Sequence, residues 1–187
     1  MPFTKTAFPD LLIFEPVVHG DSRGYFYESY NEKTFQSEGL NFRWVQDNQS
    51  SSSFGVIRGL HFQIPPHTQT KLIRVLSGKI LDLVVDIRKG SPAYGKVFSV
   101  ELSAENKKQL LVPKGFAHGF AVLSETAEVL YKCDALYHKP SELGILYADP
   151  ALQINWGVPV DQAIVSDKDK VLPCLAEFDS PFEFEHR

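Results

Sequence analysis

Residues Gly55–Val75 read GVIRGLHFQIPPHTQTKLIRV, and the fold is decided by this stretch. Its two adjacent prolines disfavour helix and interrupt pairing, so the apolar runs on either side are predicted to be strands joined by a loop. On the second strand the odd positions Lys71, Ile73 and Val75 share a face, which places a lysine at the end of an apolar stripe. One such lysine usually extends to water. The histidine and arginine on the first run favour a pocket instead.

Composition narrows the class of protein. The chain has 187 residues, which suits a single domain over residues 1–187, with 43% hydrophobic and 12% aromatic residues as in packed globular proteins. Its net charge of −4, without a long basic run, argues against nucleic acid or an anionic membrane as a partner. We find no signal peptide pattern, no run of ~18 apolar residues and no CxxC motif. We therefore expect a reduced, cytoplasmic protein.

Short strand-like segments recur along the chain between turns rich in Gly, Pro and Ser. Beyond the opening stretch, strands are predicted at residues 25–30, 42–48, 72–76, 80–87, 96–102, 107–112 and 127–137. Asn31 is predicted to cap a short helix that ends at Gly39. Residues 8–18, interrupted by two prolines, should form an edge strand or a lead-in, and residues 49–53 a polar connector. This spacing predicts an all-β jelly-roll sandwich or barrel with a few short helices.

Four side chains stand out as chemically capable. His61 lies between two apolar residues, although a lone histidine in such a run is more often simply hydrogen-bonded. Arg58 can share its face only if Gly59 forms a β-bulge, because positions 58 and 61 have opposite parity on a regular strand. His118 lies in a glycine-rich run that allows close backbone approach. Tyr131 faces small residues, although a tyrosine on such a face is usually structural.

The same stretch bears on a possible metal site. A cupin-type site needs paired histidines at H-x-H, a carboxylate a few residues later and a further histidine. Here Gln63 replaces the second histidine, and Gln69 and Lys71 replace the carboxylate. A lysine in the pocket would repel a divalent cation, so we expect no metal. We also expect no nucleotide cofactor, because the chain has no G-x-G-x-x-G or Walker A loop.

Six blocks of sequence, taken together and in order, resemble the dTDP-4-dehydrorhamnose 3,5-epimerase family. They read GVIRGLHFQ, QTKLIRVLSGKILDLVVDIRKGSPAYG, LSAEN, PKGFAHGFAVL, AEVLYKCDALY and SDKD, and the resemblance extends roughly over residues 14–173. It implies a cupin-type jelly roll without metal or nicotinamide, assembled as a homodimer to which residues 1–50 contribute. It implies epimerisation of dTDP-4-dehydro-6-deoxy-D-glucose at C3 and C5 to dTDP-4-dehydro-L-rhamnose, in dTDP-L-rhamnose biosynthesis. Residues 174–187 carry no recognisable motif.

The resemblance also implies roles for individual residues. His61 would be the base, Asp169 the carboxylate that orients it, Lys71 the cation beside the ketone oxygen and Tyr131 the acid on the opposite sugar face. Tyr137 would stack on the thymine ring. The remaining substrate contacts implied are Arg23, Glu28, Gln46, Asp47, Asn48, Arg58, His118, Glu142 and Lys168. Asp167 lies two residues from Asp169, so it stays an alternative partner for His61.

Three other functions remain open from the sequence. The first is an epimerase that inverts only one carbon of a related dTDP-4-keto-deoxysugar. The second is a non-catalytic cupin that binds a nucleotide sugar, which would not need a base and an acid together. The third is a metal-dependent cupin oxygenase or isomerase, which Gln63 and Lys71 disfavour.

Overall fold

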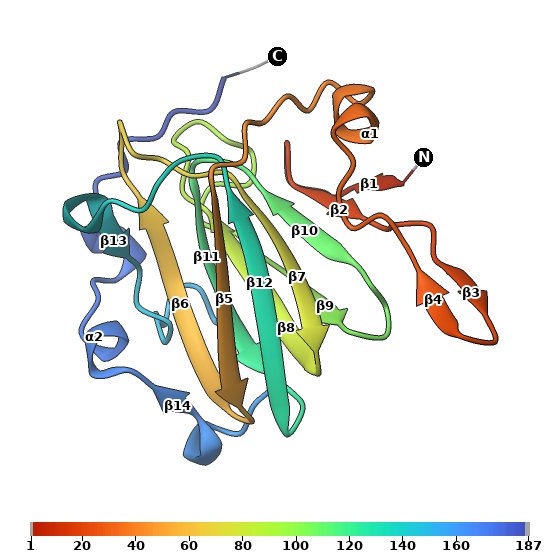
Figure 1. Cartoon of the computed structure of the whole chain (residues 1–187). Helices are drawn as coiled ribbons and strands as arrows, with labels where there is room; N and C mark the ends of the chain where they lie inside the picture. The colour runs from red at the N-terminus through yellow and green to blue at the C-terminus, as the bar shows by residue number, and fades with distance from the viewer. Residues whose placement is uncertain (1, 186–187) are drawn as a thin grey trace.

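Two facing β-sheets form the body of the computed structural model, which describes residues 2–185 (Figure 1). The first sheet has the order β1 (Phe3–Lys5), β2 (Leu12–Phe14), β10 (Gln109–Val112), β7 (Lys71–Ser77), β12 (Thr126–Cys133) and β5 (Gln46–Ser53). The second has the order β13 (Glu142–Gly144), β6 (Val56–Gln63), β11 (Phe116–Val122), β8 (Lys79–Asp86) and β9 (Val97–Ser103), with β14 (Ile164–Val165) parallel to β6. The predicted all-β sandwich is confirmed.

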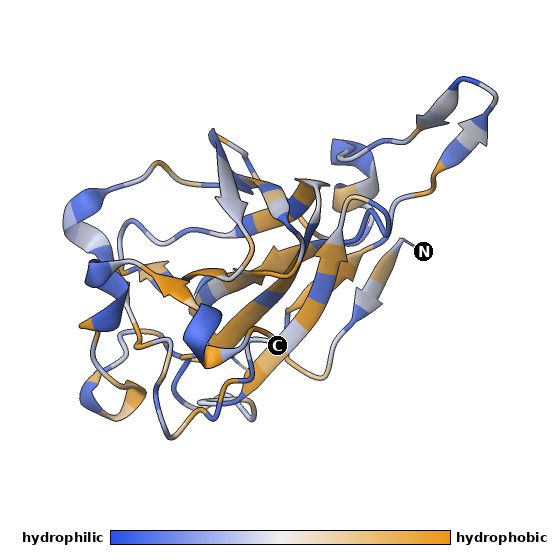
Figure 2. Cartoon of the chain, turned by 90° about the horizontal axis from the view of Figure 1, so that it is seen from below, coloured by the Kyte–Doolittle hydropathy of each residue, from blue (hydrophilic) through white to orange (hydrophobic). Residues whose placement is uncertain are grey.

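The remaining elements are short. Helix α1 (Glu32–Gln36) begins at the predicted N-cap Asn31, whose side chain accepts hydrogen bonds from the backbone of Lys33 and Thr34. Helix α2 (Asp167–Lys170) follows β14 directly. Single 3-10 turns occur at Lys139–Ser141, Val160–Gln162 and Leu175–Glu177. Strands β3 (His19–Asp21) and β4 (Gly24–Phe26) pair only with each other and form a hairpin that projects away from both sheets (Figures 1 and 2).

The main core lies between the sheets. Ile73 and Leu110 of the first sheet meet Val84 and Phe120 of the second in one buried cluster. Apolar residues recur along the strands of both sheets, as the hydropathy colouring of Figure 2 shows, and many of them are buried. Burying each such side chain contributes roughly 1.5–3 kcal/mol relative to leaving it exposed. The sandwich is therefore held together by the residues whose alternation predicted its strands.

The C-terminal residues cover the outer face of the second sheet. Phe182 is buried there with Ile87 and Trp156 in a second apolar cluster. Two backbone hydrogen bonds join this segment to Lys89: the Lys89 N–H donates to the carbonyl of Phe182, and the Phe184 N–H donates to the carbonyl of Lys89. The segment without a recognisable motif is thus an integral layer of the fold as far as the structure describes it.

Several predicted boundaries were wrong, for identifiable reasons. Residues 49–53 are not a connector but belong to β5, whereas residues 42–45 are irregular. Strand β4 ends at Phe26, well short of residue 30, and β12 ends at Cys133, so Tyr137 lies in a loop. Strand β2 pairs with both β1 and β10, so the edge of this sheet is β1 and not the proline-flanked segment. The predictions followed apolar alternation, which β5 does not show because its inward residues are polar.

Candidate active site

A cavity of about 520 Å³ lies between the two sheets and is lined by residues from both. A second hollow of about 200 Å³ adjoins it and shares four lining residues with it: His61, Lys71, Tyr131 and Glu142. Among the residues singled out in the sequence, the larger hollow is also lined by Arg58, His118, Lys168 and Asp169. The smaller takes Gln46, Asn48 and Tyr137. Most of the predicted site residues therefore meet in one place.

His61 and Asp169 form a close pair. The Nε2 atom of His61 lies 2.7 Å from Oδ1 of Asp169, whose side chain is almost fully buried. Burial alone raises the pKa of Asp169, but the hydrogen bond from His61 and the neighbouring backbone N–H of Gly59 bring it below its usual value. The aspartate is therefore ionised and accepts the Nε2–H. The other ring nitrogen, Nδ1, keeps the lone pair that can accept a proton.

Asp167 is excluded as the partner of His61 in this structure. Its side chain is fully exposed and pairs with Lys170 at 3.1 Å. The short helix α2 explains the difference, because its N-cap Ser166 accepts a hydrogen bond from the backbone N–H of Asp169. That cap turns Asp169 toward β6 and leaves Asp167 in solvent.

The β-bulge required by the sequence argument is present in β6. Opposite it on β11, His118 pairs with His61 and Phe120 pairs with Arg58, so three steps on β6 face two on β11. Gly59 makes this possible: a Cβ atom there would lie 2.5 Å from Cα of Gly119. Arg58 and His61 consequently line the same cavity.

Lys71 and Tyr131 face the histidine from the opposite sheet. They lie on the adjacent strands β7 and β12, and the Nζ atom of Lys71 is 5.9 Å from the centre of the Tyr131 ring. Burial lowers the pKa of Lys71, because it disfavours the charged amine, and raises the pKa of Tyr131. The phenol therefore keeps its proton at neutral pH. One wall of the cavity carries a histidine that can accept a proton, and the other carries a phenol that can donate one beside the Lys71 amine.

Glu142 organises the mouth of the cavity. It accepts hydrogen bonds from the Tyr137 hydroxyl at 2.9 Å and from Lys168 Nζ at 2.5 Å. Burial raises the pKa of Glu142, yet these two donors bring it below its usual value. The ring of Tyr137 is 49% exposed and so has a free face for a ligand.

Two supporting residues were not singled out from the sequence. The buried carboxylate of Asp82 lies 2.9 Å and 3.1 Å from Nε2 of His118. The Ser52 hydroxyl accepts hydrogen bonds from Nε and Nη2 of Arg58, both at 3.1 Å. The sequence did contain a signal for Asp82, because an aspartate inside the apolar run ILDLVV needs a polar partner. Ser52 lies in residues 49–53, which were predicted to be a connector, and no sequence pattern marked it as a site residue.

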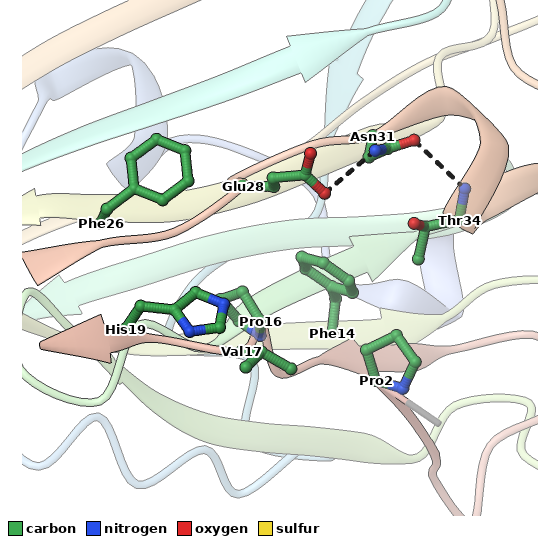
Figure 3. A pocket seen from close by; sticks show the side chains of 9 residues that line it. All are labelled: Pro2, Phe14, Pro16, Val17, His19, Phe26, Glu28, Asn31 and Thr34. Carbon is green, nitrogen blue, oxygen red and sulfur yellow. Dashed lines mark hydrogen bonds between the residues drawn. The ribbon is translucent and has the colours of Figure 1, made fainter.

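Three predicted contacts do not reach the cavity within one chain. Arg23 lies in the β3–β4 hairpin and pairs with Asp21 at 2.5 Å. Glu28 lines a separate hollow of about 330 Å³ and accepts a hydrogen bond from Asn31 (Figure 3). Asp47 points to the outer face of β5, where it pairs with Lys132 at 3.0 Å.

The donor set does not suit a metal. Among residues 2–185, no three or more His, Cys, Asp or Glu side chains are grouped so that they could hold a metal ion. At the position of the second cupin histidine, the amide of Gln63 is instead hydrogen-bonded to backbone atoms. Within the same residues, no helix is long and apolar enough to cross a membrane.

Comparison with known proteins matches this geometry to one family. The family model described as dTDP-4-dehydrorhamnose 3,5-epimerase matches residues 5–177. The enzyme of that name from Shigella flexneri is 52% identical over 170 residues, covering 90% of this chain and 93% of the relative. That from Pseudomonas aeruginosa is 46% identical over 180 residues, covering 96% and 98%.

Solved structures agree. A dTDP-6-deoxy-D-glucose-3,5-epimerase from Legionella pneumophila, solved with dTDP-4-keto-L-rhamnose, has a TM-score of 0.93 at 45% identity, with 98% of each chain covered. ChmJ, a 3'-monoepimerase from Streptomyces bikiniensis solved with dTDP-quinovose, has a TM-score of 0.84 at 33% identity, covering 91% of this chain and 86% of that one. The predicted cupin-type jelly roll is confirmed. The chain belongs to the dTDP-4-dehydrorhamnose 3,5-epimerase family.

Proposed function

We propose that this protein is an isomerase that inverts C3 and C5 of dTDP-4-dehydro-6-deoxy-D-glucose and so forms dTDP-4-dehydro-L-rhamnose for dTDP-L-rhamnose biosynthesis. One observation carries the proposal: the His61–Asp169 pair and the Tyr131 phenol reach a single cavity from opposite sheets. The relatives that bear the epimerase name at 46–52% identity support it. The lower identity of the monoepimerase favours inversion at both carbons over inversion at one.

Each step follows from the chemistry of the side chains. The ketone at C4 makes the hydrogens on C3 and C5 acidic. His61 accepts one through Nδ1, the C–H electron pair moves into an enolate, and Asp169 stabilises the positive ring that results. The Lys71 ammonium stabilises the negative oxygen of the enolate, where an electrostatic donor in a water-poor site has most effect. Tyr131 then delivers a proton to the same carbon from the other face, which inverts it.

The rest of the cavity suits a nucleoside diphosphate. Arg58 and Lys168 place nitrogen donors along the larger hollow, which His118 also lines, and a guanidinium group in particular matches phosphate oxygens. The exposed ring of Tyr137 borders the smaller hollow, where it can stack on the thymine. Gln46 and Asn48 lie beside it with amide groups for polar contacts.

The direct test is incubation with dTDP-4-dehydro-6-deoxy-D-glucose in deuterated water, following C3 and C5 separately by NMR. We expect deuterium to enter at both carbons and both to invert. Exchange at one carbon would replace the proposal with the single-carbon reaction. Binding of the nucleotide sugar without any exchange would make the protein a non-catalytic binding module.

We further propose that the protein is a homodimer in which the β3–β4 hairpin crosses to a second copy. The hairpin makes no strand pairing with its own sheets and exposes Tyr25 and Phe26 by 62% and 68%. Arg23 on its tip and Glu28 just after it stay outside their own cavity. A second copy would cover the aromatic rings and receive both side chains at its site. The hollow that Phe26 helps to line is open to such a partner (Figure 3).

Light scattering on Phe26→Asp measures this assembly. We expect a dimer for the unaltered protein and a monomer with reduced turnover for the variant. Val160→Asp is the matched control, because Val160 is 95% exposed and belongs to the 3-10 turn just before β14, a strand that Figure 1 shows on the opposite side of the molecule from the β3–β4 hairpin. A fully active monomer of the unaltered protein would contradict the proposal.

The free thiols of Cys133 and Cys174 support a reducing compartment, and we propose the cytoplasm.

A further inference from the structure

The loop that carries Tyr137 has little regular backbone pairing. Strand β12 ends at Cys133, and the chain continues with a backbone bond from the Asp134 N–H to the carbonyl of Thr70. Residues 135–138 then run past the smaller hollow before the 3-10 turn begins at Lys139. Leu136 and Tyr137 are exposed, so this stretch of backbone is held in place only where side-chain partners reach its N–H and C=O groups.

Side-chain amides supply those partners. Three glutamines contact successive peptide groups of the loop: Gln69 donates to the carbonyl of Ala135 at 2.8 Å, and Gln46 accepts from the N–H of Tyr137 at 2.8 Å. Gln63 makes the remaining contacts. We call Gln46, Gln63 and Gln69 the glutamine clamp.

Gln63 is the central member of the clamp. Its Oε1 accepts from the N–H of His138 at 2.6 Å, and its Nε2 donates to the carbonyls of His67 at 2.7 Å and Leu136 at 3.5 Å. It therefore holds the residue before and the residue after Tyr137, and ties both to the loop that follows β6. The rings of His67 and His138 stack at 3.7 Å and extend the same junction.

Only an amide fits this position. Gln63 is 5% exposed and uses both N–H groups and its carbonyl, so it must donate and accept at once. A glutamate would place a charge against two carbonyls. A cupin histidine has at most one donor when the other ring nitrogen accepts. Gln63 thus stands at the sequence position of the second cupin histidine, but its amide is used in hydrogen bonds to the backbone of residues 67, 136 and 138.

We propose that Gln63 is a positioning residue for nucleotide recognition, which fixes the Tyr137 ring in the orientation that stacks on the base. The inference rests on the proposed function, since it requires that the base of a nucleotide sugar lies against Tyr137. Gln63 takes no part in proton transfer, which the proposed function assigns to His61 and Tyr131. Its loss weakens binding of the nucleotide and leaves the chemical step intact once substrate saturates the site.

The test is a double-mutant cycle with dTDP as the probe. Affinity for dTDP is measured by calorimetry for the unaltered protein, Gln63→Met, Tyr137→Ala and the double variant. Stacking of a base on an aromatic ring changes affinity by roughly 5- to 150-fold, and we expect a loss in this range from Tyr137→Ala. We expect Gln63→Met to weaken binding too, and the double variant to be no weaker than Tyr137→Ala. At saturating substrate, kcat of Gln63→Met should stay unchanged while KM rises.

Controls separate positioning from general damage. Gln49→Met makes the same substitution on an exposed glutamine of β5 and should leave dTDP affinity unchanged. Gln63→Asn, which keeps an uncharged amide on a side chain one methylene shorter, serves as the second variant if Gln63→Met does not fold. Losses that multiply in the double variant, or a fall in kcat without a change in dTDP affinity, would overturn the inference. Failure of the unaltered protein to bind dTDP would overturn the proposed function itself.

Discussion

Replacing Asp169 by asparagine tests how much the carboxylate contributes to the base. The asparagine can still accept the Nε2–H of His61 through its amide oxygen, so the change removes the negative charge with little change in shape. At the observed separation of 2.7 Å, the bond to an ionised acceptor contributes about 1.5–3 kcal/mol. A neutral bond contributes about 0.5–1.5 kcal/mol, so the difference alone corresponds to roughly tenfold in rate.

The full charge interaction sets the upper limit. Two unit charges about 4 Å apart interact by about 4 kcal/mol at an effective dielectric constant of 20, which is roughly a thousandfold in rate. We therefore expect Asp169→Asn to lower kcat between these limits. Deuterium entry at C3 and C5 should fall by the same factor, because His61 removes both protons. The assay is NMR in deuterated water with saturating substrate.

Asp167→Asn is the matched control for this variant. It makes the same substitution two residues earlier, on a fully exposed side chain whose surface pair with Lys170 contributes little. We expect its rate to equal that of the unaltered protein. The reasoning is refuted if Asp169→Asn keeps the full rate, or if Asp167→Asn loses as much.

The same variant has a pH signature in stability. Because the pKa of Asp169 in the folded protein is below its ordinary value of 3.8, its ionised form stabilises the fold above that pH. This contribution is lost as the pH falls through the folded pKa. The melting temperature of Asp169→Asn should therefore be lower than that of the unaltered protein at pH 7, and the gap should close below about pH 3.8.

Four further outcomes are expected. Lys71→Ala should lower kcat by ~100-fold or more and affect KM less, because enolate charge appears in the transition state; a raised KM alone would contradict this. Since burial lowers the pKa of Lys71, activity should fall as the pH rises through it, and Lys71→Arg should move that limb to higher pH in the measured profile. Tyr131→Phe should retain deuterium exchange but impair inversion, most at C5; inversion of both carbons at the full rate would assign the acid to another group. Exhaustive chelation should leave turnover unchanged, and rescue of a lost activity by a divalent metal would show the opposite.

Apolar alternation made much of the sandwich predictable. Strands β7, β8 and β9 lie close to the predicted residues 72–76, 80–87 and 96–102, because each presents apolar side chains to a buried surface. The irregularity within β6 was also predictable. The opposite parity of Arg58 and His61 required a bulge at Gly59, and the register with β11 contains it.

Strand β5 shows where the pattern fails. Its residues alternate in burial, but the inward positions are polar: Gln46, Asn48 and Ser50 line the two hollows, and Ser52 accepts hydrogen bonds from Arg58. A strand that faces a polar cavity lacks the hydrophobic stripe that identifies strands over an apolar core. The serines at positions 50–53 therefore read as a connector. Local sequence does not reveal that this strand faces a cavity instead of an apolar core.

Partners distant in sequence could be inferred only by resemblance or not at all. Asp169 follows His61 by 108 positions, and nothing local distinguishes it from Asp167. The distinction comes from the Ser166 cap and the packing of α2 beside β6, both of which are tertiary facts. Gln63 was noticed for the histidine it replaces. Its contacts with the loop around Tyr137 depend on three segments that meet only in the folded chain.

The sandwich itself explains how a small site can invert a carbon. Inversion needs a proton removed from one face of the sugar and returned to the other, so base and acid must flank the ring. Side chains on one face of a single sheet point the same way and approach a ligand from one side. Here His61 comes from β6 in one sheet and Tyr131 from β12 in the other, with Lys71 one strand away from the tyrosine. In the proposed reaction the C4 ketone is bonded to both C3 and C5, so a lysine beside its oxygen would stabilise either enolate, and one base and one acid could serve both carbons.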